Sequence, residues 1–480
     1  MIEFMFSIGS GIIYTIIFIL YFATILGIIG VVISENRNPV KSLAWVTVLL
    51  LLPIIGMVLY AFFGRNFKSK RMISRQNKRK LRKREKFKRI DCEKLNLTFE
   101  SKQQIKLGFS LIGAEYFPGN KIDIFTDGKE KFESLIKDLE NAKLYINLQY
   151  YIFENDKIGN IIKDILIQKA KSGVKVRVIY DHVGCFNVNK KFYKEMCLAG
   201  VDAKPFLKVT FPKFATRINW RNHRKICVID GEIGYIGGMN IADRYVDGVY
   251  YGDWRDTHLR ILGPAVGGLQ YVFAVDWNFM SESLLTDITK HYNVPDNAMD
   301  GVQIMTSGPL GQWSNISFEY LKAISNAKKC IYIQTPYFLP TESLLKALET
   351  AALAKVDVRI MMPEKSDSII LRLASFSYIS ECLRAGIKIY LYQKGMLHAK
   401  TLIIDDEFSS NGSTNFDFRS FEHNFESNAF IYSKDFNNLM KKIFFNDVVH
   451  CRRVNTTLWR HRSLYNKALE SIVRLLSPVL

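Results

Sequence analysis

Two segments of the chain repeat one pattern of chemically reactive side chains. In both segments His, Lys, Asp, Gly and Asn stand at offsets 0, +2, +7, +14 and +17. The first copy comprises His223, Lys225, Asp230, Gly237 and Asn240, and the second comprises His398, Lys400, Asp405, Gly412 and Asn415. An imidazole can act as a nucleophile, an acid or a base, and a buried ammonium group can hold an anionic group. The pattern therefore predicts a catalytic site that acts on an anionic substrate.

Two simpler interpretations compete with catalysis. A single histidine on an apolar strand is more often a packed core residue than a catalyst, but two copies at equivalent places, each with its Gly and Asn, favour a site. A metal centre is the next alternative because histidine is a common ligand. Neither copy supplies a second close ligand, and the neighbouring lysine would repel a cation, so we expect no metal.

The residues around each histidine predict how it is positioned. The residues that follow it are apolar and β-branched, as in Ile226–Ile229, which is typical of a buried strand. Because side chains alternate along a strand, His223 and Lys225 fall on the same face. Asp230 and Gly231 fit a tight turn, which would return the chain so that Gly237 and Asn240 lie beside the histidine.

The repeat extends beyond these motifs. Asn141-Ala142-Lys143 recurs as Asn326-Ala327-Lys328, and Val174–Arg177 recurs as Val356–Arg359. A period of roughly 180 residues indicates a duplicated domain, since solenoid units are only about 20–50 residues long. The predicted fold class is α/β, with two copies of one domain, each a mixed sheet flanked by helices, related by a pseudo-two-fold axis. We expect the copies over residues 103–295 and 296–480.

Two uncharged, apolar runs precede the duplicated part, at about residues 11–33 and 42–64. A helix of 23 residues is about 34 Å long at 1.5 Å per residue, and a bilayer core is about 30 Å thick. We therefore expect a two-helix membrane hairpin over residues 1–64, with a possible bend in the second helix at Pro53 and Gly56. A cleaved signal peptide fits less well because the first run is too long and has no basic start.

The net charge of +20 is concentrated in a predicted linker over residues 65–102. Between Arg65 and Arg89 stand fourteen Lys or Arg and one acid, Glu85, a net +13 of the total. This strip directly follows an apolar run, so it favours anionic lipid headgroups over nucleic acid. Positive flanks stay on the cytoplasmic side, and the seven cysteines form no C-x-x-C pair, which fits a reduced compartment.

The motifs are similar to those of the phospholipase D superfamily, whose signature is two H-x-K-x4-D sequences in one active site. The apolar hairpin and several further strings narrow the resemblance to bacterial cardiolipin synthases. These strings are Asn38–Trp45, Gln149–Tyr151, Trp254–His258, Gln334–Phe338 and Arg474–Pro478. At Gly238 many superfamily members have serine, so one possible hydroxyl donor to phosphate is absent here.

The resemblance implies the reaction and the role of each residue. One phosphatidylglycerol gives its phosphatidyl group to another in an anionic bilayer, so that cardiolipin and glycerol form through a phosphohistidine without a cofactor. His223 is expected as nucleophile and His398 as acid and base, although the pseudo-symmetry leaves this order open. The remaining roles are phosphate binding by Lys225, Lys400, Asn240 and Asn415, ring orientation by Asp230 and Asp405, and outer support of the imidazoles by Asp256 and Glu426.

Three questions stay open at this stage. A membrane-anchored phospholipase D that passes the same intermediate to water would carry the same motifs. Asp256 and Glu426 could equally be surface ion-pair residues. The oligomeric state is not indicated.

Two other segments could contact lipid. The first half has 11 extra residues between its Ala-Gly-Val sequence and His223, within the aromatic and basic stretch 206–221. We expect this insertion to form a lip that admits lipid, although single-strand nucleic acid stacking or an ordinary packed loop would also explain it. The segment with Arg452, Arg453, Trp459, Arg460 and Arg462 is a weaker candidate.

Overall fold

The computed structural model describes residues 2–34, 39–60, 72, 74–84, 90–209, 220–281, 284–285 and 297–477. The chain divides into two compact units. One consists of residues 1–67 with 209–219, and the other of residues 68–208 with 220–480. Most of the predicted lipid-admitting lip (210–219) and much of the basic strip (65–71 and 85–89) lie outside the described residues.

The first unit contains the helices α1 (Ile2–Ser34), α2 (Pro39–Leu51) and α3 (Pro53–Leu59). Within α1, residues Tyr14–Ile33 are the one described stretch that is long and apolar enough to cross a membrane. Val32, Leu49 and Tyr60 pack together where the three helices meet. Among the described residues, α1 is therefore the helix of membrane-spanning length.

The predicted second span over 42–64 is not a single continuous helix. Helix α2 ends at Leu51, Leu52 leaves the helical conformation with φ −132° and ψ 65°, and α3 begins at Pro53. Proline has no N–H and its ring clashes with the preceding helical turn, so the bend lies where the sequence indicated it. A Cβ atom at Gly56 would lie 2.9 Å from the Val48 carbonyl oxygen, which shows that α3 folds back on α2. Residues 61–64 lie outside the described part.

The catalytic unit is built on one mixed sheet that both copies of the duplicated domain share. The first half supplies β1 (Tyr116–Phe125), β2 (Tyr145–Tyr150), β3 (Lys175–Asp181), β4 (Asp202–Phe206), β5 (Ile226–Ile229), β6 (Ile233–Gly237) and β8 (His258–Leu262). The second half supplies β9 (Asp300–Ser307), β10 (Cys330–Gln334), β12 (Asp357–Pro363), β13 (Lys388–Tyr392), β15 (Thr401–Ile404), β16 (Phe408–Gly412), β18 (Glu426–Tyr432) and β19 (Cys451–Arg453).

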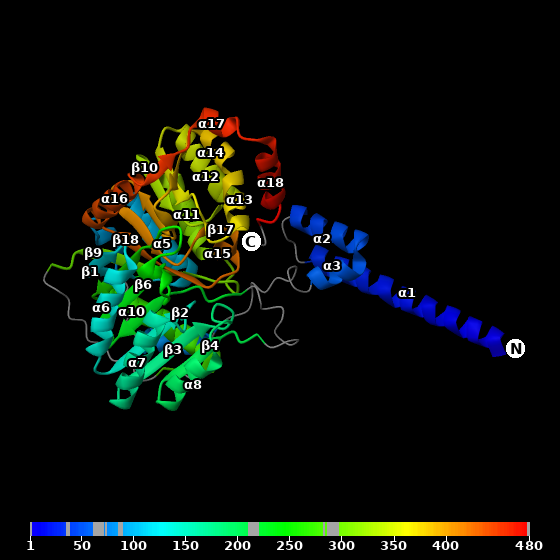
Figure 1. Cartoon of the computed structure of the whole chain (residues 1–480), viewed down its shortest axis with the longest axis horizontal. Helices are drawn as coiled ribbons and strands as arrows, with labels where there is room; N and C mark the ends of the chain where they lie inside the picture. Colours follow the sequence, from blue (N-terminus) through cyan, green and yellow to red (C-terminus); the bar gives the residue numbers. More distant parts are fainter. Residues whose placement is uncertain are drawn as a thin grey trace. The chain divides into compact units, whose positions relative to one another are not determined.

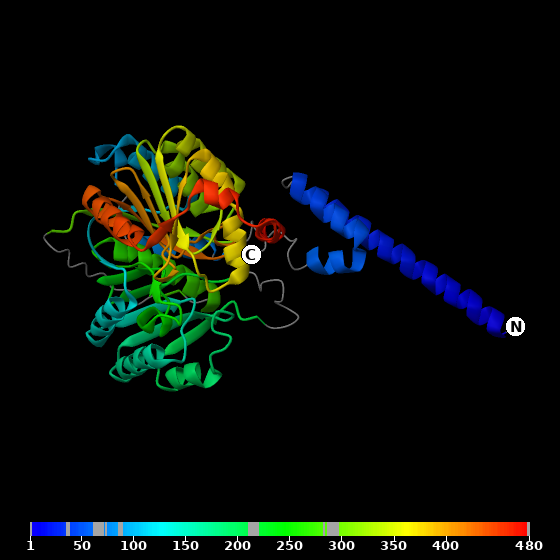
Figure 2. The ribbon, with the colours of Figure 1, turned by 45° about the horizontal axis from the view of Figure 1, so that its top comes forward.

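The strand order shows the duplication directly. From one edge it runs β19-β13-β12-β10-β15-β16-β18-β9-β1-β8-β6-β5-β2-β3-β4. Reading outward from the central pair, β9-β18-β16-β15-β10-β12-β13 repeats the order of β1-β8-β6-β5-β2-β3-β4. Strands β1 and β9 are antiparallel, as a pseudo-two-fold axis between them requires. Figures 1 and 2 show the two halves on either side of this centre.

Helices accompany the sheet in the described part of this unit. They are α4 (Arg75–Arg84), α5 (Phe99–Ile112), α6 (Gly128–Glu140), α7 (Lys157–Lys171), α8 (Lys190–Leu198), α9 (Arg244–Asp247), α10 (Ala265–Ser281), α11 (Asn315–Asn326), α12 (Glu342–Leu353), α13 (Ile369–Ser377), α14 (Ile379–Ala385), α15 (Phe418–Glu422), α16 (Lys434–Val448), α17 (Thr456–Arg460) and α18 (Leu464–Arg474). Helices α10 and α16 pack over the middle of the sheet and form one core that joins the halves.

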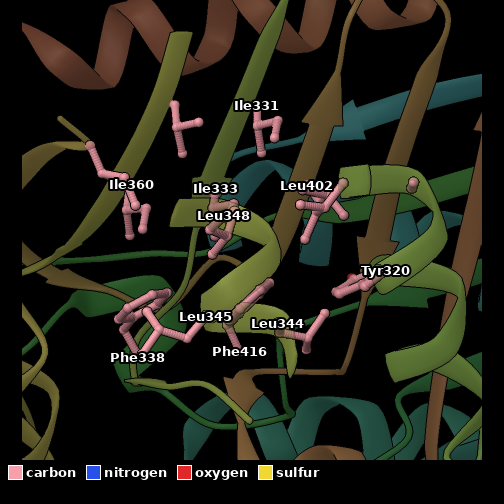
Figure 3. Close-up of a cluster of buried hydrophobic side chains, with 14 of the residues drawn as sticks. Tyr320, Ile331, Ile333, Phe338, Leu344, Leu345, Leu348, Ile360, Leu402 and Phe416 are labelled. Carbon is pink, nitrogen blue, oxygen red and sulfur yellow. The ribbon is translucent and has the colours of Figure 1, made fainter. Parts of the chain in front are cut away.

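Each half has a separate core on the other face. In the second half, Ile331 and Ile333 of β10 pack against Leu344 and Leu348 of α12, with Phe338 and Phe416 at the end of the cluster (Figure 3). The equivalent core of the first half contains Ile146, Leu148 and residues of α6 and α7. Tyr332, between the two isoleucines, faces the joint core instead, because side chains alternate along a strand.

Candidate active site

The two repeated motifs begin at equivalent places in the sheet. His223 and Lys225 immediately precede β5, and His398 and Lys400 immediately precede β15. Both histidines line a single cavity of about 550 Å³ at the junction of the two halves. Only 8% of His223 and 7% of His398 is exposed, so each imidazole is largely dry but still borders the cavity. The fold therefore brings together two residues that are 175 positions apart in the sequence.

The lysines lie beside the imidazoles and are fully or almost fully buried. Lys225 Nζ donates to the His223 carbonyl oxygen at 2.6 Å, and Lys400 Nζ lies 2.7 Å from His398 Nδ1. Burial lowers the pKa of Lys225 well below its usual range. Burial also lowers the pKa of Lys400 to about 8, although the negative charge of Asp256 opposes this shift. Both amino groups thus lie directly beside the histidines that line the cavity, and an anion bound there would favour their charged form.

Each histidine contacts a carboxylate that belongs to the opposite half of the molecule. His223 Nδ1 lies 3.0 Å from Glu426 Oε1, and His398 Nδ1 lies 2.5 Å from Asp256 Oδ2. Both carboxylates are completely buried. These contacts fix the ring orientation and leave Nε2 as the atom that faces chemistry, although in His398 this atom also lies 3.2 Å from Lys400 Nζ.

Backbone pairing produces the two crossed contacts. The strand β14 (Gly395–Leu397) pairs in parallel with β7 (Asp253–Arg255), with Leu397 opposite Arg255, so the next residues, His398 and Asp256, meet. At the equivalent place Asn222 bridges Phe425, and the next residues, His223 and Glu426, meet. The His398 N–H donates to the Arg255 carbonyl, as the His223 N–H does to Phe425. One pseudo-symmetric register thus sets both pairs.

The cavity environment favours neutral imidazoles. Burial lowers the pKa of His398 to about 4, assisted by the charge of Lys400. Burial also lowers the pKa of His223, although Glu426 opposes the shift. Burial disfavours ionisation of Asp256 and Glu426 too, but the adjacent Lys and His side chains hold their carboxyl pKa values below the ordinary ones. A neutral His223 has the lone pair that nucleophilic attack requires.

The two motif asparagines also border the cavity. The side-chain oxygen of Asn240 accepts from the Ile152 N–H at 3.1 Å, and its amide donates to the Tyr245 hydroxyl at 2.8 Å. Asn415 hydrogen bonds to the Asp417 carboxylate. Both amides are therefore anchored to the protein at the edge of the cavity.

The motif aspartates do not orient the imidazoles, contrary to the expectation. Asp230 lies at the far end of β5, where its carboxylate accepts from the backbone N–H groups of Lys143, Leu144 and Tyr145 at 2.7–2.8 Å. Asp405 binds the N–H groups of Lys328, Lys329 and Cys330 at the far end of β15. A seven-residue offset along an extended strand separates Asp and His by roughly 20 Å of chain, which excludes direct contact. Both aspartates instead tie a turn to the start of the neighbouring strand.

Packing explains why residue 238 is a glycine. A Cβ atom there would lie 2.1 Å from Asp256 Oδ1, so a side chain would displace the carboxylate that contacts His398. The equivalent residue, Ser413, donates its hydroxyl to Glu426 Oε2 at 2.5 Å. At this position of the second half the hydroxyl therefore donates to the carboxylate that contacts His223.

Two buried arginines donate hydrogen bonds to the backbone carbonyl groups of Glu426 and Asp256. Arg224 Nε donates to the Glu426 carbonyl oxygen at 3.1 Å, and its guanidinium binds Asp276 of α10. Arg255 donates to the Asp256 carbonyl oxygen at 2.8 Å and binds Asp447 of α16. The two aspartates also accept from equivalent glutamines, Gln149 of β2 and Gln334 of β10, at 2.6 and 2.7 Å. These networks give the same role to Gln149 in the first half and Gln334 in the second.

One pair of cavity residues was missed at the sequence level. Arg244 and Arg419 each stand 21 residues after their motif histidine, in the short helices α9 and α15, and both line the cavity. Arg244 pairs with Glu154 at 2.9 Å. Within the described residues, Arg419 has no carboxylate partner. Extending the list of repeated offsets from +17 to +21 would have found both arginines.

Comparison with known proteins shows the family of the chain. Residues 135–250 and 320–448 match the family model "Cardiolipin synthase, PLD-like domain", and residues 18–65 match "Phospholipase_D-nuclease N-terminal". The chain is 41% identical to the major cardiolipin synthase ClsA of Bacillus subtilis over 98% of its length and 99% of that protein. It is 39% identical to a cardiolipin synthase of Listeria monocytogenes, which covers 94% of this chain and 95% of that one.

The fold has a solved counterpart. The phosphatidylserine synthase structure from Haemophilus influenzae superimposes with a TM-score of 0.61 at 14% identity, over 79% of this chain and all of that one. This likeness concerns the duplicated α/β architecture. With its two motifs joined at one cavity and its near full-length relatives, the chain belongs to the cardiolipin synthase family of the phospholipase D superfamily.

Proposed function

We propose that the chain transfers a phosphatidyl group from one phosphatidylglycerol to the hydroxyl of another, giving cardiolipin and glycerol. The observation that carries this proposal is the pair of histidines at one cavity, each held by a carboxylate of the opposite half and flanked by a buried lysine. A phosphodiester repels nucleophiles because it is negatively charged. Lys225 and Lys400 offset that charge on the non-bridging oxygens, with Asn240 and Asn415 at the cavity edge.

In the first step, neutral His223 Nε2 attacks phosphorus while the bond from phosphorus to the glycerol oxygen breaks. His398 gives its proton to that oxygen, and glycerol leaves. The negative charge of the bound phosphodiester raises the pKa of His398 above its value in the empty cavity, which favours the protonated form that this step needs.

In the second step, a hydroxyl of another phosphatidylglycerol gives its proton to His398 and attacks the phosphohistidine. The bond from phosphorus to nitrogen breaks and His223 returns to its neutral form. The same sites serve both steps, so donor and acceptor replace each other at one cavity. The crossed contacts are pseudo-symmetric, and His223 is taken as nucleophile by its resemblance to the family.

The proposal extends to the location of the enzyme. We infer that α1 crosses the cell membrane and that the catalytic unit lies on the cytoplasmic side, because the basic strip after the apolar region is expected to face acidic lipids there. Cys197 is exposed and suits a test. A membrane-impermeant thiol reagent should label it in lysed but not in intact cells.

The central experiment supplies labelled phosphatidylglycerol to the membrane-embedded protein and identifies the products. Cardiolipin with an equal amount of glycerol supports the transferase. Phosphatidic acid with glycerol would instead indicate a hydrolase and would overturn the proposal. The variants His223→Ala and His398→Ala should form no product while remaining in the membrane fraction. Full turnover by both variants would exclude the two-histidine mechanism.

A further inference from the structure

Solvent-exposed apolar side chains stand close in sequence to residues that line the catalytic cavity. In the second half, α13 contributes Leu371 to the cavity wall, and the residues just before it, Ile369 and Ile370, are 68% and 49% exposed. In the first half, a tight turn joins Val249 to Gly252 through two backbone hydrogen bonds and presents Tyr250, which is 99% exposed. Solvent-exposed apolar residues therefore come from both halves beside one opening.

The residues on either side of the Tyr250 turn place this turn close to the cavity. Trp254, which follows the turn, and Tyr245, which precedes it, both line the cavity. Burial raises the pKa of the neighbouring Tyr251, and so does the charge of Asp367, which also lines the cavity and precedes α13. The turn of the first half and the start of α13 in the second half thus border the same opening.

Helix α18 extends this apolar surface. It packs alongside α13 (Figure 1) and buries Val473 and Glu470 on its inner side. Its outer side carries Tyr465 and Ile472, which are 75% and 62% exposed, and Leu475 directly after the helix is 79% exposed. Apolar residues spaced by about one or two helical turns form a stripe, and such a stripe on a surface helix normally faces a core. Here it faces away from the protein.

Positive charges without a carboxylate partner occur in the same C-terminal segment. Among the described residues Arg453, Arg460 and Lys467 have no such partner, and Lys467 Nζ donates to the Arg460 carbonyl oxygen at 2.6 Å. The other basic residues of this region pair with acids: Arg452 with Glu364, Arg462 with Glu470 and Arg474 with Glu381. Trp459, which we considered as a surface contact, is only 6% exposed and lies under the Arg462 guanidinium. The available cations, rather than Trp459, therefore mark the outer surface.

The combination points to one occupant. Apolar and aromatic side chains with surrounding cations are the features that bind a helix to the headgroup region of an acidic bilayer. A second copy of the chain is a poorer match, because pairing the surface with itself would bring the unpaired cations of both copies together. The cavity lies beside the same surface, so a bilayer bound there would bring its lipids next to the site. This argument rests on the proposed function.

We propose that the catalytic unit docks face-on to an anionic bilayer through Tyr250, Ile369, Ile370, Tyr465, Ile472 and Leu475, which we call the docking surface. Phosphatidylglycerol then reaches the cavity by moving out of the bilayer between the Tyr250 turn and α13, without crossing open water. The docking surface is separate from the helix α1, so it acts in a protein that is already anchored.

The test uses the full chain in vesicles rich in phosphatidylglycerol and the double variant Ile472→Asp/Leu475→Asp. Glycerol release is measured from bilayer lipid and from a short-chain, monomeric phosphatidylglycerol. The expected result is a loss of about tenfold or more on bilayers, because charged residues do not enter the apolar boundary, with turnover of the short-chain substrate within about twofold of wild type. Leu198→Asp is the matched control, since Leu198 is 78% exposed on α8 of the first half.

Each outcome decides the proposal. Unchanged turnover on bilayers overturns it, and equal loss on both substrates assigns the residues a folding role instead. A spin label placed by Ile472→Cys, in a Cys197→Ser background, should contact oxygen dissolved in the bilayer, whereas one placed by Leu198→Cys should contact a water-soluble relaxant. Glycerol release reports transfer and hydrolysis alike, so failure of the synthase proposal would appear in the lipid products and not in this comparison.

Discussion

At the scale of single residues, the site depends on two histidine–carboxylate pairs beside one cavity, each with a buried lysine next to its histidine. The carboxylates of Asp256 and Glu426 are fully buried and contact the histidines of the opposite half. A buried carboxylate beside an imidazole favours the protonated ring, whereas burial and the lysines favour the neutral ring. The difference between these effects sets the pH range in which one ring can attack and the other can donate a proton.

Asp256→Asn tests this balance. Removing a negative charge beside His398 lowers its pKa further, so His398 loses its proton at lower pH and the alkaline limb of the kcat profile should move to lower pH. We expect kcat at neutral pH to fall about a hundredfold. Measurement of kcat against pH checks the direction. A lower kcat at every pH, with the acid and alkaline limbs at their wild-type pH values, would contradict this expectation. Asp230→Asn is the control and should leave both limbs unchanged.

Arg419→Gln tests the cavity cation that has no carboxylate partner in the described part of the chain. Loss of a charge-assisted hydrogen bond to an anionic lipid costs about 1.5–3 kcal/mol, so KM for phosphatidylglycerol should rise about ten- to a hundredfold with a smaller change in kcat. Arg419→Lys should recover part of the loss because it keeps the charge but not the fork of donors. Arg384→Gln, on an exposed residue of α14, should have no effect; an unchanged KM in Arg419→Gln would refute the role.

At the scale of secondary structure, the motif is a strand with a function at each end. His223 and Lys225 stand at the cavity end of β5, and Asp230 stands at the other end with a φ of 54°. Aspartate tolerates this left-handed conformation better than most residues, and its carboxylate satisfies three backbone donors of the chain leading into β2. The H-x-K-x4-D spacing thus records the length of one strand as well as its chemistry.

Asp230→Ala should therefore act on stability and not on the pH profile. Leaving the backbone donors without their acceptor should lower the free energy of unfolding by about 1–2 kcal/mol. Thermal unfolding in detergent checks the loss, and Asp405→Ala should give a similar one. A variant with wild-type stability but a shifted kcat profile would show that the aspartate acts on the histidine after all.

At the scale of the whole molecule, neither half contains a complete site. The central sheet continues from β1 to β9 across the pseudo-two-fold axis, and α10 and α16 share one core over it. Each imidazole takes its carboxylate from the other half. Duplication therefore produced one enzyme with one cavity rather than two linked enzymes.

The separate halves, residues 1–295 and 296–480, should consequently release no glycerol from phosphatidylglycerol. Each lacks the partner of its own histidine and exposes the unpaired edge of β1 or β9, which invites aggregation. Co-expression should restore some turnover if the halves find each other through the sheet. Turnover by the first half alone would contradict the crossed arrangement, and intact chain expressed in parallel serves as the control.

The sequence by itself determined the duplication, the α/β class, the two His-x-Lys pairs and the break at Pro53, because these depend on local pattern and on exact repetition. It also singled out Asp256 and Glu426 as possible supports, without saying which histidine each would serve. Only the tertiary structure decided that the contacts cross between the halves, that Asp230 and Asp405 lie away from the rings, and that Gly238 is required by packing. Those features depend on strand register across a sheet whose neighbouring strands are far apart in sequence, and no local pattern encodes that register.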